Sequence, residues 1–349
     1  MKVKQVNFNF ELEGNGIVNF DSGVQKFLWN RESKEGKKNN FSSVDNNNVY
    51  AKKVYHRDEN GVLRYKIKIS SDALRNAIFK GDAIATNSSI SHHKALLNSF
   101  IGSTLGLVRG YMFAGRNETL KKKSPLTITA AHQTNNAESY MEFHSRSGYK
   151  KVADDSGTGD TTIFNKETIG EITYEGKGFI NLQDLEFISC DSIFDRYSFN
   201  PDDYETLKMF LSNNLPGFNS ELGYHTLKSS AIDVAEYGIK LNNDNILFLI
   251  KETLRRVFSM NIMKANSYAK ISKLSIQLVV DPINPSKNLW IDINSVEDIN
   301  NLNFEIEEFY TLTDESDAKA KREIIEEAIR KDIEIKIQEK EKKQKEKKA

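Results

Sequence analysis

The sequence has little cysteine, proline and tryptophan. Its 349 residues contain one cysteine, five prolines and two tryptophans. The single cysteine, Cys190, excludes an internal disulfide and any zinc site built from several cysteines, which is typical of a reducing compartment. Because Cys190 lies in the apolar stretch LEFISCD, we expect a small buried residue there rather than a nucleophile.

Long apolar runs and nucleotide motifs are missing as well. No apolar run approaches the roughly 20 residues that a membrane helix needs, and the opening MKVKQVNFNFEL lacks the apolar core of a signal peptide. We therefore expect a cytoplasmic protein without a membrane partner. The chain contains no phosphate loop, dinucleotide glycine motif or Ser/His/Asp signature, so we expect neither a cofactor nor a metal.

The charges of the chain are balanced overall but separated along it. Lys plus Arg and Asp plus Glu both number 49. Residues 89–128 nevertheless contain six Lys or Arg and one acid, whereas residues 290–318 contain nine acids and no Lys or Arg. Local patches are therefore a better guide to partners than the net charge.

Apolar periodicity predicts helices and strands without the regular βαβ rhythm of a doubly wound sheet. We expect strands at residues 6–12, 63–69, 107–113, 124–129, 185–191 and 269–281, a hairpin at 161–180, and helices at 70–79, 91–101, 200–215 and 242–260. Ser70 or Ser71 can cap the helix at 70–79. Residues 30–60 and 130–159 are predicted as polar loops. This mixture favours an α+β fold with long inserted loops.

The strongest functional signal is the basic stretch that runs from Arg109 to Ser124. It gathers Arg109, Arg116 and three consecutive lysines around Tyr111. Single-stranded nucleic acid is held by a positive groove along the phosphates and by side chains that stack on bases. We interpret the stretch as an RNA-binding surface, while a solvated lysine loop beside an ordinary strand remains the alternative.

Catalytic readings of the sequence have weaker support. His92 and His93 could act on RNA as acid and base, but adjacent residues on a helix point about 100° apart and do not chelate a metal together. A contact with phosphate near the helix start fits His92 better. Asp21 follows GIVNF in a turn and is a candidate carboxylate for RNA cleavage, although turns often use aspartate. The residues thus favour a binding protein over an enzyme.

Several segments, in consistent order, resemble the Cas seven family, the guide-RNA backbone subunits of CRISPR surveillance complexes, and are most similar to the subtype I-F variant. These segments are GNGIVNF, KIKISSDALRNAIF, GLVRGYMF, KKKSPL, TTIFNKETIGEITYEGKGFINLQDLEFISCDSIFDR and GIKLNNDNILFLIKETLRRV. They span residues 14–257. The resemblance implies a ferredoxin-like palm, related to RNA-recognition modules, with inserted finger loops and a thumb hairpin.

The resemblance also implies a role and a set of contacts. Copies of such a protein polymerise along one guide RNA without catalysis, beside other subunits of the interference complex and a target nucleic acid paired to the guide. The residues expected to meet RNA, from the resemblance and the basic stretch together, are Ser70, Ser71, Arg75, His92, Arg109, Tyr111, Arg116, Lys121, Lys122, Lys123, Ser124 and Phe164. We place Phe164 near the tip of the thumb hairpin.

The expected organisation is an RNA-binding palm over residues 1–312, with a finger loop at about 30–60 and the thumb within about 130–179. Residues 313–349 form a charged tail, helical or disordered. The expected function is that of a non-catalytic guide-RNA-binding backbone subunit. The alternatives are an endoribonuclease of the same superfamily and a general single-strand binder. We also expect the acidic segment 290–318 to face a neighbouring subunit or solvent rather than the guide.

Overall fold

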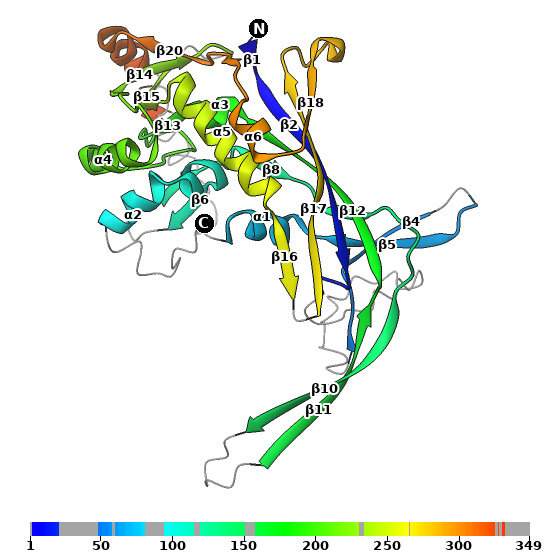
Figure 1. Cartoon of the computed structure of the whole chain (residues 1–349). Coiled ribbons are helices and arrows are strands. Elements are labelled where there is room, and N and C mark those ends of the chain that lie inside the picture. Colours follow the sequence, from blue (N-terminus) through cyan, green and yellow to red (C-terminus); the bar gives the residue numbers. More distant parts are fainter. Residues whose placement is uncertain are drawn as a thin grey trace, which may run out of the picture.

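The computed structural model describes residues 2–20, 48–57, 60–80, 94–114, 119–150, 158–229, 234–264, 266–324, 327 and 330–331, arranged as Figure 1 shows. Helices and strands are mixed, as the predicted α+β class requires. Among the described helices, none combines the length and the apolar character needed to cross a lipid bilayer.

A nine-stranded sheet forms the largest layer of the described fold. Along its main path the strands are β16 (Asn261–Lys264), β17 (Ser267–Val279), β2 (Gln5–Asn15), β12 (Glu171–Asn181), β9 (Ala131–Gln133), β5 (Leu63–Ile69) and β4 (Lys53–Arg57). Strand β18 (Leu289–Ile293) pairs with β17, and β8 (Leu126–Ile128) pairs with β12. Neighbouring strands are antiparallel, so each strand keeps the alternation of buried and exposed residues that made β2, β5 and β17 predictable.

Strand β2 supplies much of the core, as its alternation predicts. Its buried face consists of Val6, Phe8, Phe10 and Leu12, each at most 2% exposed. The rings of Phe8 and Phe10 lie over Gly178 and Gly176 of β12, where an added Cβ would approach a ring carbon to 2.2 Å. Glycine at these two positions of β12 therefore lets the phenylalanines cover the sheet.

Two amphipathic helices with polar N-caps share this core. They are α1 (Ser71–Ile78), capped by Ser70, and α5 (Asn243–Phe258), whose cap Asn242 accepts a hydrogen bond from the Asn245 amide at 2.9 Å. Their buried residues, which include Leu74, Leu249 and Leu254, belong to one apolar cluster with the sheet. The predicted starts of both helices are confirmed.

A second sheet of the described fold has four strands. Its order is β13 (Phe187–Ser189), β15 (Ala235–Lys240), β14 (Leu222–Leu227) and β20 (Tyr310–Thr313). The other elements are α2 (Lys94–Ile101), α3 (Leu182–Glu186), α4 (Tyr204–Asn214), α6 (Val296–Asn300), the short helices η3 (Leu105–Arg109), η4 (Pro201–Asp203) and η5 (Pro285–Lys287), and the strands β1 (Lys2–Val3), β6 (Tyr111–Ala114), β7 (Thr119–Lys122) and β19 (Glu305–Ile306). Cys190 follows β13 and is buried, as expected.

Residues 315–324, at the start of the charged segment, form a helix docked on the four-stranded sheet. Arg322 pairs with Asp191, whose side chain is 2% exposed, and the Arg322 guanidinium lies 5.5 Å from the centre of the Tyr224 ring. Ala318 is fully buried. In the rest of the charged tail, residues 325, 326, 328, 329 and 332–349 lie outside the described residues.

A long two-stranded ribbon projects from the body (Figure 1). It pairs β10 (Tyr140–Lys150) with β11 (Thr158–Thr168), and β3 (Asn48–Val49) joins β11. The expected polar loop at 130–159 is therefore largely strand. The expected hairpin at 161–180 is also wrong, because β11 pairs with β10 while β12 pairs with β2. The alternation located these strands but carried no information about their partners.

The strand expected at residues 107–113 begins only at Tyr111. Leu105–Arg109 form a π-helix, and Gly110 follows with a φ of 73°. A side chain at Gly110 would bring its Cβ to 2.5 Å from the Lys122 carbonyl oxygen. The left-handed glycine and this close approach explain why the chain turns at residue 110 before β6 starts.

Candidate nucleic-acid interface

The start of helix α1 is a candidate anion site, because the first backbone amides of a helix have no hydrogen-bond acceptor within the helix backbone. Ser70 caps the helix, and its Oγ accepts hydrogen bonds from the Ala73 amide at 3.4 Å and from Asn19 Nδ2 at 3.0 Å. Ser71 is the first helical residue and is half-buried. Helix N-termini favour anions because amides and the helix dipole point outward. Asp72, in the first turn, places one negative charge at the same end.

Arg75 connects α1 to the basic stretch. Its Nη2 donates to the Arg109 carbonyl oxygen at 2.7 Å and to Ser124 Oγ at 3.2 Å. Burial and the nearby Arg109 charge lower the pKa of Arg75, and Asp72 opposes them. Because the structure holds two guanidinium groups close enough to repel each other, an added anion would stabilise them.

Arg109 and Ser124 complete this cluster. Arg109 Nη2 donates to Asn76 Oδ1 at 2.9 Å, and Ser124 Oγ donates to the Leu126 carbonyl oxygen at 2.6 Å. The structure thus brings together five of the predicted RNA-binding residues from separate segments of the sequence: Ser70, Ser71, Arg75, Arg109 and Ser124. We call this group, with Asn76, the α1 cluster.

The three consecutive lysines do not share one surface. Lys121 pairs with the exposed Asp195, and Lys123 Nζ lies 2.8 Å from Asp184 Oδ2 with 72% of its side chain exposed. Lys122 is only 6% exposed. Its ammonium donates to the carbonyl oxygens of Asp184 and Phe187, both at 2.9 Å. The structure therefore places Lys122 inside the protein, so its predicted place on an RNA-binding groove is wrong.

Lys122 is buried because β7 alternates sides. Lys121 and Lys123 fall on one side of the strand and Lys122 on the other, where Asp184 and Phe187 accept its hydrogen bonds. Burial lowers the pKa of Lys122 to about 8, although the charges of Asp184 and Glu236 oppose that shift. The Lys122 ammonium therefore connects β7 to the carbonyl oxygens of Asp184 and Phe187 inside the protein and does not face RNA.

Tyr111 also faces the protein interior. Its hydroxyl donates to the Ser198 carbonyl oxygen at 2.8 Å, and its ring meets the edge of Phe100 with 5.7 Å between centroids. Burial raises the pKa of the hydroxyl, and the Ser198 hydrogen bond opposes that shift. Tyr111 therefore packs against its own protein in this structure, in place of the expected stacking on a base.

Two of the predicted RNA-binding residues lie outside the described residues, and a third lies on the ribbon. His92 and Arg116, like the alternative catalytic residues His93 and Asp21, lie outside the described residues. Phe164 lies within β11, opposite His144 on β10, and the two rings stack with 5.6 Å between centroids. It therefore sits along the ribbon rather than beside a turn. Ile169, which follows β11, is 2% exposed and packs in the core.

The sequence did not predict the side chains that form hydrogen bonds or ion pairs with the candidate RNA-binding residues. Asn76 orients Arg109, Asn19 supports the Ser70 cap, and Asp184 pairs with Lys123 from 61 residues away (184 minus 123). Of these, only Asn76 could have been predicted from its place in the sequence, because it follows Arg75 on the same helix. Within the described residues, no group of three or more His, Cys, Asp or Glu side chains could hold a metal ion.

A family model defines the class of this chain as a CRISPR-associated protein. The model described as "Type I-Fv CRISPR-associated protein Cas7fv-like" matches residues 2–309. The chain belongs to the Cas7fv-like family, and the resemblance drawn from its sequence is confirmed.

Two solved structures are also similar to the chain. One is titled "CRISPR RNA-guided surveillance complex", with 11% identity and a TM-score of 0.38 over 80% of this chain and 72% of the other. The second, "CRISPR RNA-guided surveillance complex, pre-nicking", has 10% identity and a TM-score of 0.38 over 80% of both chains. Comparison with curated proteins finds no match.

Proposed function

We propose that the chain is a non-catalytic subunit that binds the guide RNA of a CRISPR interference complex, with further copies of itself along the same RNA. Its family supports a place in a CRISPR system. The observation that supports RNA binding is the α1 cluster, where the Arg75 guanidinium donates to the Arg109 carbonyl oxygen and the Arg109 charge lowers the pKa of Arg75. In the proposal, RNA phosphates supply negative charge to these two cations.

The proposal assigns a part of the fold to each part of this function. In our proposal the nine-stranded sheet with α1 and α5 is the ferredoxin-like palm, and the ribbon of β10 and β11 is the thumb that meets the guide beside the next copy. The ribbon lies within the interval 130–179 expected for a thumb. Other subunits of the complex and a target strand paired to the guide complete the set of proposed partners.

The proposal is tested by assembling purified protein on guide RNAs of increasing length and measuring the mass of each complex. The number of bound copies is expected to rise in regular steps with guide length. An unrelated RNA that binds as tightly, even with the flanking subunits present, would favour a general single-strand binder instead.

The same assembly reaction separates binding from cleavage. Guide and complementary RNA are incubated with the protein, with and without magnesium, and the products are resolved by length. We expect intact RNA. Specific products that disappear when Asp21 or His92 is substituted would establish the endoribonuclease alternative and overturn the non-catalytic role.

Phe164→Ala is expected to reduce guide protection at regularly spaced positions. The ring is half-buried and stacks on His144 of the ribbon, away from the main core, so its loss leaves the monomer folded. Nuclease footprinting of the assembled complex measures the effect.

Phe143→Ala is the matched control for that substitution. Phe143 lies on β10 next to His144, hence on the opposite face of the ribbon, and is 74% exposed. An unchanged footprint in Phe164→Ala contradicts the proposed contact. Loss of protection in Phe143→Ala alone would move the contact to the other face.

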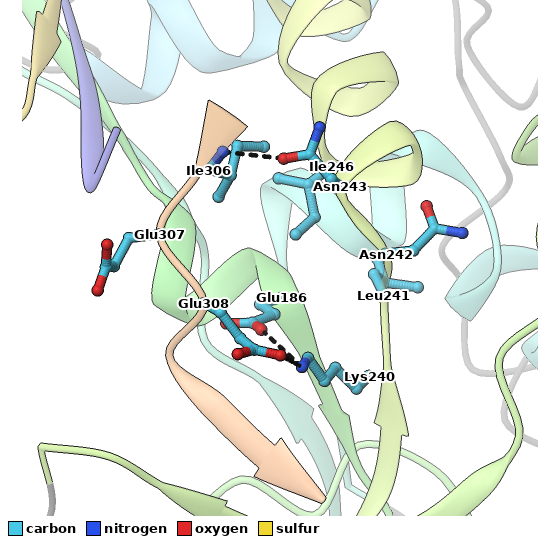
Figure 2. A pocket seen from close by; sticks show the side chains of 9 residues that line it. All are labelled: Glu186, Lys240, Leu241, Asn242, Asn243, Ile246, Ile306, Glu307 and Glu308. Carbon is cyan, nitrogen blue, oxygen red and sulfur yellow. Dashed lines mark hydrogen bonds and ion pairs between the residues drawn. The ribbon is translucent and has the colours of Figure 1, made fainter. Parts of the chain in front are cut away.

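Glu305→Gln with Glu307→Gln is expected to reduce assembly on a long guide while sparing the binding of one copy to a short guide. Glu305 is exposed, and Figure 2 shows the Glu307 side chain directed away from Lys240. Both acids can therefore meet a basic surface of a neighbouring copy, where such charges set association rate and register. Complex masses on the two guide lengths give the readout.

Glu308→Gln serves as the control for this pair of acids. Glu308 Oε2 accepts from Lys228 Nζ at 2.7 Å and Oε1 accepts from Lys240, and these hydrogen bonds lower its pKa to about 2. It is thus satisfied within its own chain, and we expect its substitution to change stability rather than assembly. Equal loss on both guide lengths in the Glu305 and Glu307 variant would contradict a role confined to assembly.

A further inference from the structure

Glu167 is a buried carboxylate at the base of the ribbon. It lies on β11, opposite Met141 of β10, and is 3% exposed. Its Oε2 accepts a hydrogen bond from the Ala51 amide at 2.9 Å, and its Oε1 lies 2.7 Å from Lys53 Nζ. Because a buried carboxylate is costly unless its oxygens are paired, these contacts tie the end of β11 to residues 51–53.

Two more side chains complete the polar network around Glu167. Ser139 Oγ donates to Glu167 Oε1, and the Tyr65 hydroxyl lies 3.2 Å from Ser139 Oγ. Lys53 Nζ lies 4.2 Å from the centre of the Tyr65 ring. Lys53 and Tyr65 belong to the hairpin of β4 and β5, which projects from the body as the ribbon does (Figure 1). The network therefore joins the base of the ribbon to that hairpin.

The same segment reaches the α1 cluster through Asn19. The Lys52 amide donates to the Asn19 carbonyl oxygen at 3.1 Å, and Asn19 Nδ2 donates to Ser70 Oγ at 3.0 Å. Asn19 is 8% exposed, so both hydrogen bonds form away from bulk water. Residues 51–53 therefore contact Glu167 on one side and, through Asn19, the cap of α1 on the other.

A second set of contacts follows the same route. Strand β11 pairs with β3 through Lys166 and Val49. Lys166 Nζ also lies 4.8 Å from the centre of the Phe20 ring, and Phe20 forms an antiparallel bridge with Ala51. Since Phe20 follows Asn19 directly, the base of the ribbon and the cap of α1 are joined by two independent sets of contacts.

Asn19 also determines what the Ser70 hydroxyl can do. Ser70 Oγ accepts hydrogen bonds from Asn19 Nδ2 and from the Ala73 amide, so neither contact uses the hydroxyl proton. A serine hydroxyl has one proton to donate and two lone pairs to accept with. With both lone pairs occupied, the Ser70 proton is left to donate to an anion at the start of α1.

We propose that Glu167 and Asn19 are positioning residues that couple the ribbon to the guide site. A phosphate held by Ser70 fixes Asn19 and residues 51–53, which in turn fix the direction of the ribbon toward the next copy on the RNA. Binding of one copy therefore prepares the binding of the next. The inference rests on the proposed guide-binding function, and guides of two lengths distinguish its failure from the failure of that function.

The first test compares Glu167→Gln with the wild type on a guide that accommodates one copy and on a guide that accommodates two. The variant keeps an oxygen that can accept from the Ala51 amide but loses the ion pair with Lys53. We expect unchanged affinity for the short guide. On the longer guide, the second copy is expected to bind about fivefold or more weakly relative to the first, as loss of coupling between sites requires. Native mass spectrometry counts the copies.

The second test uses hydrogen exchange and does not depend on affinity. Both the wild type and Asn19→Ala are saturated with the short guide, and exchange is followed in the peptide that contains Glu167. We expect the guide to slow exchange of this peptide in the wild type and to leave it unchanged in Asn19→Ala, because the substitution removes the side chain between Ser70 and residues 51–53. A residue with only a structural role would not alter this response to the guide.

Glu236→Gln is the matched control for Glu167→Gln. Glu236 is 2% exposed and accepts from Arg196 Nε at 2.9 Å, but it lies on β15 of the four-stranded sheet. Both variants lose a buried ion pair, and only Glu167 contacts the base of the ribbon. Lys53→Arg keeps a cation beside Glu167 and is expected to assemble as the wild type does.

Two results would overturn the inference. The first is a second copy that binds equally well to the wild type and to Glu167→Gln, or that is weakened to the same extent in Glu236→Gln. The second is slowed exchange of the Glu167 peptide that persists in Asn19→Ala, since the guide would then act on the ribbon without Asn19. Absence of short-guide binding in the wild type would instead overturn the proposed function.

Discussion

Arg109→Gln is expected to weaken guide-RNA binding by about 10- to 100-fold. Loss of a hydrogen bond between a charged group and a phosphate costs about 1.5–3 kcal/mol, and each 1.4 kcal/mol is a factor of ten. The substitution keeps the backbone carbonyl oxygen of residue 109, which accepts a hydrogen bond from Arg75. The backbone arrangement of the α1 cluster is therefore expected to be unchanged. Filter binding at several salt concentrations measures both the affinity and its salt slope.

Arg255→Gln provides a closely matched control. Arg255, on α5, donates to Asn300 Oδ1 through Nε at 3.0 Å and Nη2 at 2.8 Å, just as Arg109 donates to Asn76 Oδ1. Both substitutions remove one charge and an arginine–asparagine contact, but only Arg109 lies in the α1 cluster. Equal affinity of the two variants would contradict the proposed interface.

Lys122→Glu is expected to destabilise the fold by about 3–5 kcal/mol, the range for an uncompensated buried charge. The new carboxylate would face the carbonyl oxygens of Asp184 and Phe187, which now accept hydrogen bonds from the ammonium. Lys123→Glu, one residue away and exposed, is expected to change stability by less than about 1 kcal/mol but to weaken RNA binding. Chemical denaturation and filter binding, applied to both variants, separate the roles of the two lysines.

The buried lysine also predicts a pH dependence. The pKa of Lys122 in the folded protein is about 8, whereas its ordinary value is 10.5. The unfolded chain therefore keeps the Lys122 proton up to a higher pH than the folded protein does. Stability contributed by this group therefore rises as the pH increases from about 8 toward 10.5. Lys122→Met is expected to abolish that rise. An unchanged pH profile, or two lysine variants of equal stability, would contradict the assignment of Lys122 to the interior.

The sequence predicted those parts of the fold that depend on local pattern. Alternation in β2 and β5 and the polar caps of α1 and α5 are properties of adjacent residues, and the structure confirms them. The strand partners were not predictable in the same way. Alternation in β11 is the same whether it pairs with β10 or β12, because the pattern within one strand does not specify which strand lies beside it.

In the candidate site, too, residues with a local signal were predictable and residues that depend on distant contacts were not. Ser70 and Ser71 were recognisable as possible caps, Arg109 belonged to the basic stretch, and the family resemblance added Arg75. Lys122 is buried whereas Lys121 and Lys123 are not, because Lys122 donates to the carbonyl oxygens of Asp184 and Phe187. These two residues lie more than 60 positions away in sequence (184 minus 122 is 62). Tyr111 likewise depends on Ser198, so its burial follows from the tertiary fold and not from the basic stretch around it.

The strand expected at residues 107–113 shows how local sterics override pattern. Leu107, Arg109 and Tyr111 alternate as a strand would, yet the first two lie in a π-helix. Gly106 is packed so closely that a Cβ would meet the Phe100 carbonyl oxygen at 2.2 Å. This packing and the left-handed Gly110 determine the backbone here, and they place Arg109 beside α1 rather than on a sheet.

Crosslinking the protein to its guide with ultraviolet light and identifying the attached peptides by mass spectrometry tests the central claim most directly. With guide RNA alone, the account predicts crosslinks in the peptides that contain Ser70 to Asn76 and Arg109 to Ser124, and their loss in Arg109→Gln but not in Arg255→Gln. Crosslinks confined to other parts of the chain, with these two peptides unmodified, would contradict guide binding at the α1 cluster.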